Sequence, residues 1–151
     1  MDFQLHNSFT FWVSRLANVM QERFNHELQV LDVTWPQWMV MNVLAHDLAQ
    51  TPAQVAAHIG VDRSAVTRLV DRLEKKGMVE RHHDGLDRRS IKVVLTDAGK
   101  RLVRHLDEAA HNHQQNFLKE LPSTEYRVLK GNIQKMLRAG GIETLELWKH
   151  V

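Results

Sequence analysis

Residues 51–99 constrain the fold more than any other part of this 151-residue chain. They begin with a helix-start pattern, in which Thr51 can cap a helix whose first residue is a proline, and Gln54 completes a capping box. Gly60 then permits a sharp turn, because a residue without Cβ adopts positive φ at no steric cost. Asp62 can cap a second helix, which the next glycine ends. Two helices joined by so tight a turn predict a helix-turn-helix unit.

The second helix, residues 63–76, has two chemically different faces. At about 100° per residue its apolar side chains fall on one side and are expected to face a core: Ala65, Val66, Leu69, Val70 and Leu73. The opposite side and its flanks carry Arg63, Ser64, Thr67, Arg68, Asp71, Arg72 and Lys75. A solvated face accounts for such a pattern on an isolated helix. Hydroxyl groups interleaved with guanidinium groups are also the donors that reach base edges and phosphates in a DNA groove.

A β-hairpin with a charged tip is expected directly after this helix. Residues 78–83 suit a strand, residues 84–89 (DGLDRR) form the expected tip, and residues 90–95 alternate as a second strand. Helix, turn, helix and hairpin is the order of a winged helix, so the predicted fold class is mainly α with a small β-hairpin wing. Residues 63–92 contain nine Lys or Arg against five acids, a net charge of +4, whereas the whole chain has +2. The positive charge is therefore concentrated where DNA would lie.

The run SAVTRLVDRLEKKGMVER, residues 64–81, resembles the recognition-helix signature of the MarR (multiple antibiotic resistance regulator) family. Asp87-Arg88-Arg89, followed by VVLTDAG at residues 93–99, resembles the wing of that family and the entry to its next helix. Several linked motifs in the right order, over nearly the whole chain, make this resemblance specific. It implies a winged helix-turn-helix regulator of operator DNA, in which the first helix and the last two interlock two subunits.

Side-chain chemistry assigns roles to the residues expected to contact DNA: Arg63, Ser64, Thr67, Arg68, Arg72, Asp87, Arg88 and Arg89. Ser64, Thr67 and Arg68 are expected to enter the major groove, and Arg63 and Arg72 to contact phosphates. Arg89 is expected to reach the minor groove from the wing, with Asp87 as its ion-pair partner. Asp71 is expected to pair with Arg68 or Lys75, because both lie within reach on a helix.

The segments that flank the winged unit carry apolar stripes. In residues 7–31 the stripe steps by three and four: Phe9, Val13, Leu16, Met20, Phe24, Leu28 and Leu31. A dimerisation helix is the simplest interpretation, and packing within one subunit remains open. The whole chain, 1–151, is interpreted as one MarR-like domain, with dimerisation helices at 1–33 and 100–151 and the winged lobe at 34–99. Thr34 and Thr96 are expected to cap the helices that follow them, and the apolar tail 142–151 to pack on a partner.

The MarR resemblance also implies a small-molecule pocket between the dimer helices and the winged lobe, where aromatic carboxylates are common effectors. Trp12, Arg15, Trp38 and Asn42 fall near positions that would line it. A guanidinium group binds a carboxylate bidentately and an indole offers an aromatic ring a flat surface. An interface ion pair for Arg15 with a core position for Trp38 is an equally good interpretation.

Several function classes have no support in the sequence. The chain contains no cysteine, which excludes disulfides and thiolate metal sites. No two histidines have the i, i+4 spacing of a helical zinc site, and no phosphate-binding glycine loop or nucleophile motif is present. We therefore expect no metal, no cofactor and no enzymatic activity. The longest apolar run, residues 38–41, is far too short for a membrane span, and no signal peptide is visible, so a cytoplasmic protein is expected.

The sequence thus predicts a homodimeric regulator that binds palindromic double-stranded operator DNA. It is expected to act as a repressor that a small aromatic carboxylate releases. Two alternatives stay open: an architectural protein that binds DNA without sequence preference, and a metal-responsive regulator of the same fold. The architectural protein would show the same salt dependence with little preference among duplexes.

Overall fold

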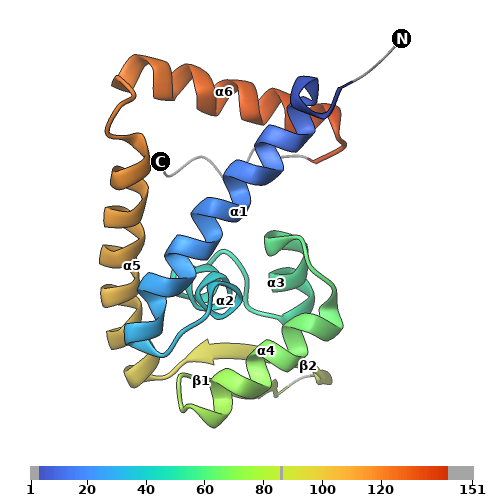
Figure 1. The fold of residues 1–151 in the computed structure, drawn as a ribbon. Helices are drawn as coiled ribbons and strands as arrows, with labels where there is room; N and C mark the ends of the chain where they lie inside the picture. The colour runs from blue at the N-terminus through green and yellow to red at the C-terminus, as the bar shows by residue number, and fades with distance from the viewer. Residues whose placement is uncertain (1–3, 86, 143–151) are drawn as a thin grey trace. The chain divides into compact units, whose positions relative to one another are not determined.

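The computed structural model describes residues 4–85 and 87–142, and side chains at 84 and 87–90 lie outside that description. Figure 1 shows a mainly helical chain with one small hairpin. The elements in order are η1 (Leu5–Asn7), α1 (Phe9–Leu28), η2 (Gln29–Leu31), α2 (Trp35–Ala45), α3 (Pro52–Ile59), α4 (Arg63–Lys75), β1 (Val79–Asp84), β2 (Asp87–Leu95), α5 (Asp97–Leu118) and α6 (Ser123–Ala139). Contacts divide the chain into two units, Met1–His113 and Gln114–Val151, and α5 runs across the division.

Side-chain caps fix where the helices begin. Thr34 and Gln37 form a complete capping box at the start of α2, and Thr51 and Gln54 form another at the start of α3. Thr96 caps α5, since its Oγ1 accepts a hydrogen bond from Gly99 N at 3.0 Å. These three predicted caps are confirmed. The backbone N–H groups in the first turn of a helix have no acceptor inside the helix, and leaving them unpaired costs free energy. Each capping side chain accepts from one of these groups and so removes part of that cost.

Two element boundaries and one helix cap differ from the sequence-based prediction. The pattern of residues after Thr34 predicts a helix that reaches about residue 48, but α2 ends at Ala45, and Asp47 then takes a left-handed conformation with φ of 54°. Asp62 occupies the N-cap of α4 without a side-chain hydrogen bond to it. β2 begins at Asp87, three residues before the expected start, so the wing's turn is shorter than predicted. Cross-strand pairing explains this last difference, because the register brings Asp84 opposite Asp87 after a bulge.

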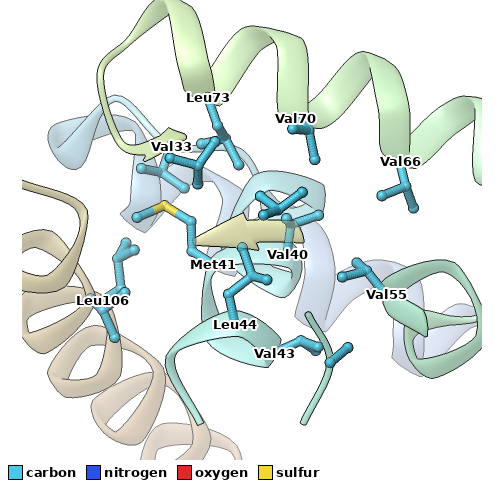
Figure 2. Close-up of a cluster of buried hydrophobic side chains, with 14 of the residues drawn as sticks. Val33, Val40, Met41, Val43, Leu44, Val55, Val66, Val70, Leu73 and Leu106 are labelled. Atoms are coloured by element: carbon cyan, nitrogen blue, oxygen red, sulfur yellow. The ribbon is translucent and has the colours of Figure 1, made fainter. Parts of the chain in front are cut away.

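The core of the first unit lies where α2 meets α3, α4, β2 and α5. Figure 2 shows Val66, Val70 and Leu73 pointing from α4 toward Val40 and Met41 of α2, and all five are fully buried. The apolar side predicted for the recognition helix is therefore confirmed. Val93 of β2 and Leu106 of α5 are buried in the same cluster, which fixes the wing and the start of α5 to the helix-turn-helix. The backbone also connects β2 to Gln50, two residues before α3, through a 2.8 Å hydrogen bond from Val93 N to Gln50 O.

The apolar stripe of α1 divides into two parts. Phe24 and Leu28, near its C-terminal end, are buried, whereas Phe9 is 63% exposed and Leu16 is 55% exposed. Packing within one subunit thus accounts for the end of the stripe and leaves its first half uncovered. In the second unit, α6 begins at Ser123 and stops before Gly140, and it carries exposed apolar side chains of its own, including Val128. Residues 143–151 of the predicted apolar tail lie outside the described residues. No described helix is both long enough and apolar enough to span a bilayer.

Candidate nucleic-acid interface

The turn between α3 and α4 positions the candidate recognition helix. Gly60 ends α3 in a left-handed conformation with φ of 72°, which a residue with a Cβ adopts only with strain. Val61 N donates back to Ala56 O at 3.2 Å, so the chain reverses within a few residues. Burial of Val66 and Val70 then fixes the rotation of α4 about its own axis. The opposite face of α4 is held toward solvent as a consequence.

All five predicted DNA-contacting residues of α4 lie exposed: Arg63, Ser64, Thr67, Arg68 and Arg72. Thr67 Oγ1 donates a 3.0 Å hydrogen bond to Arg63 O, which orients the hydroxyl and leaves its acceptor capacity free. Among the described residues, none of the three arginines forms an ion pair. Two hydroxyl groups and Arg68 therefore lie on the solvent-facing side of α4, with Arg63 and Arg72 at its two edges, a donor set suited to phosphates and base edges.

Arg81 of β1 forms ion pairs with both carboxylates of α4. Its guanidinium forms ion pairs with both Asp71 and Glu74, and its backbone N donates to Glu74 Oε1 at 3.3 Å. The predicted pairing of Asp71 with Arg68 or Lys75 is wrong, because the strand brings in a cation from outside the helix. The Arg81 side chain is only 22% exposed, so its ion pairs are better shielded from solvent than a typical surface pair.

Sequence reasoning missed Arg81, and no local pattern identifies it. It lies ten residues after Asp71 and on a different element, so helical spacing gives no signal. The consequence for the interface is electrostatic. Asp71 and Glu74 share the single positive charge of Arg81, so the negative charge that opposes the cations of α4 is reduced from two to one.

The predicted DNA-contacting residues of the wing lie on β2. Asp87, Arg88 and Arg89 belong to this strand, which pairs antiparallel with β1. Their side chains lie outside the described residues. The expected minor-groove contact of Arg89 and its pairing with Asp87 remain predictions.

The four residues predicted to bind a ligand do not come together within one chain. Trp12 and Arg15 lie exposed on the first half of α1, where Trp12 Nε1 donates to His6 O at 2.9 Å. Trp38 and Asn42 lie one turn apart on α2, and Asn42 Nδ2 donates to Asp107 Oδ1 at 3.2 Å. Trp38 packs edge-on against Phe24, with 5.1 Å between ring centroids. Arg15 precedes Phe24 by nine residues, or roughly 13 Å along a helix.

A separate pocket of about 900 Å³ lies in the first unit between the end of α2, the hairpin and the first half of α5. It is lined by both signs of charge, with Lys100 and Arg104 opposed by Asp97 and Asp107. None of the four predicted ligand residues lines it. Among residues 4–85 and 87–142, no cluster of three or more His, Asp or Glu side chains is arranged to hold a metal ion.

Comparison with known proteins points to one family. The sequence model of the MarR family matches residues 31–90, which run from η2 through the helix-turn-helix into the wing. A cysteine-to-serine mutant of MarR from E. coli, solved with operator DNA, is 28% identical over 83% of this chain and 91% of that chain, with a TM-score of 0.77. The family model over residues 31–90 and this structural match support the MarR family of winged-helix regulators.

Two further MarR-type structures share the fold at lower identity. MepR of S. aureus, solved as a DNA complex, has a TM-score of 0.82 and 22% identity over 87% of this chain and 98% of that chain. CouR of Rhodococcus jostii RHA1, solved bound to p-coumaroyl-CoA, has a TM-score of 0.78 and 21% identity over 89% of this chain and 95% of that chain. The fold of this chain, with α4 exposed on one face, is therefore that of winged-helix proteins of the MarR type.

Proposed function

We propose that this MarR-family chain is a homodimeric repressor that binds a pseudo-palindromic operator and is released by a small aromatic carboxylate. The observation that carries the DNA-binding part is the two-sided recognition helix, with Val66, Val70 and Leu73 buried and Arg63 and Arg68 exposed. A helix held in this way presents its donors in fixed positions, which sequence reading in a major groove requires.

Substitution of Arg68 tests the recognition role. Arg68→Ala is expected to weaken binding to a duplex that the wild-type protein enriches from a random pool, by roughly ten- to a hundredfold, and to relax base preference at the contacted position. Arg101→Ala, an exposed arginine of α5, is the matched control. If Arg68 contacts only a phosphate, the salt slope instead falls by about one for every duplex. Unchanged affinity in Arg68→Ala contradicts the assignment.

Exposed apolar surface supports the homodimer. Phe9, Val13 and Leu16 of α1 are exposed, as are Val128 and Leu129 of α6. On each helix, neighbouring exposed apolar side chains mark a surface that a partner covers. A second copy is the simplest partner, because a palindromic operator requires two recognition helices related by a twofold axis.

The surroundings of Trp38 support an aromatic effector. Its Nε1 is buried and has no acceptor among the described residues, while its ring packs against Trp35 and Phe24. A carboxylate oxygen would satisfy this donor, and a buried donor without a partner is costly.

Titration with benzoate and p-coumarate tests this site. Either acid is expected to lower DNA affinity in the wild type, and Trp38→Phe is expected to weaken that response while retaining DNA binding. Lys100→Met is the contrasting variant, because Lys100 lines the separate 900 Å³ pocket. A response lost in Lys100→Met and kept in Trp38→Phe would move the effector site to that pocket. No response to either acid would remove the aromatic carboxylate from the proposal.

A further inference from the structure

Lys76 makes three polar contacts with the junction between α1 and α2. Its Nζ lies 3.1 Å from Asp32 Oδ2 and 3.5 Å from Gln37 Oε1, and it also donates a hydrogen bond to the backbone oxygen of Asp32. The Lys76 side chain is 31% exposed. One ammonium group thus uses its donors on acceptors that come from another part of the fold.

These contacts connect the end of α4 to the junction between α1 and α2. Lys76 is the C-cap of α4, whereas Asp32 follows η2, the short extension of α1, in a left-handed conformation with φ of 53°. Gln37 is buried and belongs to the capping box at the start of α2. Beside the polar contacts, Val33 and Leu73 lie next to each other in the core (Figure 2). The end of α4 is therefore fixed to the point where α1 ends.

The direction of Lys76 separates it from the DNA-facing side chains. It follows Thr67 by nine residues, which at about 100° per residue places it roughly half a turn away around the helix. Thr67 lies on the exposed face of α4, and Lys76 contacts the junction on the opposite face. Although Lys76 adds to the positive charge of this segment, its ammonium group is not placed to contact the same DNA groove.

We propose that Lys76 is a positioning residue, which fixes the recognition helix to the end of α1 and transmits a displacement of α1 to α4. The inference rests on the proposed function, because it assigns a regulatory link to the same DNA-binding site. If α1 is part of the dimer interface, a change in that interface reaches α4 by this connection. Specific DNA affinity then depends on a residue that does not contact DNA.

Substitution of Asp32 changes DNA affinity in one direction if Asp32 positions α4 and in the other if Asp32 acts only through its negative charge. Asp32→Asn removes a negative charge, so long-range attraction alone would strengthen DNA binding or leave it unchanged. Asparagine tolerates the left-handed conformation, so the backbone is preserved. If the ion pair positions α4, Asp32→Asn instead weakens binding to the duplex selected by the wild type. Affinity for a scrambled duplex of the same composition should stay the same.

Lys76→Met removes the ammonium group and keeps the apolar stem. It is expected to weaken binding to the selected duplex about fivefold or more, the usual lower range for coupled sites. The salt slope should be unchanged, because no phosphate contact is lost. Lys75→Met, an exposed neighbour of equal charge, is the control and should bind as the wild type. Lys76→Arg, which keeps the charge and the donors, should recover most of the affinity.

The double variant Lys76→Met/Asp32→Asn has the net charge of the wild type. Positioning predicts that it binds as weakly as Lys76→Met alone, whereas long-range electrostatics predicts recovery. Any one of three results would overturn the inference while leaving the proposed function intact. These are recovery of DNA affinity in the double variant, a salt slope lower by about one in Lys76→Met, and wild-type affinity in both single variants. Enrichment of no duplex from the pool would instead overturn the proposed function.

The link can be measured without DNA. In the full chain, Lys76→Met should speed amide hydrogen exchange both at Val33, next to Asp32, and at Met78, which follows α4 and donates to Leu73 O at 2.9 Å. Lys75→Met should change neither site. Unchanged exchange at both sites in Lys76→Met would contradict the connection itself.

Discussion

At the scale of single residues, Gly99 lies where the first turn of α5 meets the end of α4. A Cβ placed on Gly99 would lie 2.1 Å from Met78 O, a backbone atom that cannot move without shifting the strand. The same contact region holds Thr96, whose Oγ1 donates to Gly77 O at 2.6 Å. The absence of a side chain at Gly99 is therefore required by packing.

Gly99→Ala is expected to lower the free energy of unfolding by about 1–3 kcal/mol, the usual cost of overpacking. Chemical denaturation monitored by circular dichroism measures it. Gly131→Ala is the matched control, since Gly131 lies in α6 with nothing within 4 Å of the added Cβ. There alanine should be neutral or stabilising by up to about 1 kcal/mol, because alanine has the higher helix propensity. Equal effects of the two substitutions would contradict the packing argument.

The partner of Asp71 shows what residue-level sequence reasoning can and cannot provide. Helical spacing correctly separates the buried side of α4 from its exposed side, because that separation depends only on the helix itself. The same spacing names Arg68 and Lys75 as partners for Asp71, and the structure gives Arg81 instead. Long-range pairs such as Arg81 with Asp71, or Lys76 with Asp32, depend on the packing of separate elements, which a local pattern does not contain.

At the scale of elements, Arg81 fixes β1 against α4 through Asp71 and Glu74. Arg81→Met would leave both carboxylates on the recognition helix without a partner, and they would repel DNA phosphates. We expect weaker binding to every duplex, with part of the loss recovered when Asp71→Asn is added. Fluorescence anisotropy with labelled duplexes measures both variants. A double variant that binds no better than Arg81→Met would show that the loss arises from strand position and not from charge.

Helix boundaries were predictable wherever a capping residue defines them. Thr34, Thr51 and Thr96 start their helices as expected. The end of α2 and the start of β2 were not, because Asp47 turns the chain without a glycine and cross-strand pairing lengthens β2. Whether the predicted ligand residues form one site was harder still to predict from sequence. Trp12 and Arg15 lie on one helix and Trp38 and Asn42 on another, and the relation of these helices depends on packing.

At the scale of the whole molecule, the exposed first half of α1 is expected to be covered by a second subunit. Leu16→Asp should therefore shift the protein from dimer to monomer in sedimentation velocity, because a charge cannot be buried in an apolar interface without a partner. Ser14→Asp, at an exposed polar position of the same helix, should leave the dimer intact. A Leu16→Asp protein that sediments as the wild type would contradict the role of this stripe.

The most direct test of the account is to select duplexes from a random pool with the wild-type protein and sequence those that are bound. A dimer with two exposed recognition helices should enrich two inverted half-sites, with centres about 10–10.5 bp apart or a multiple of that spacing. The enriched duplex should bind at least about a thousandfold more tightly than a scrambled duplex at the same salt concentration. Equal affinity for both duplexes would contradict the account and indicate a DNA-binding protein without sequence preference.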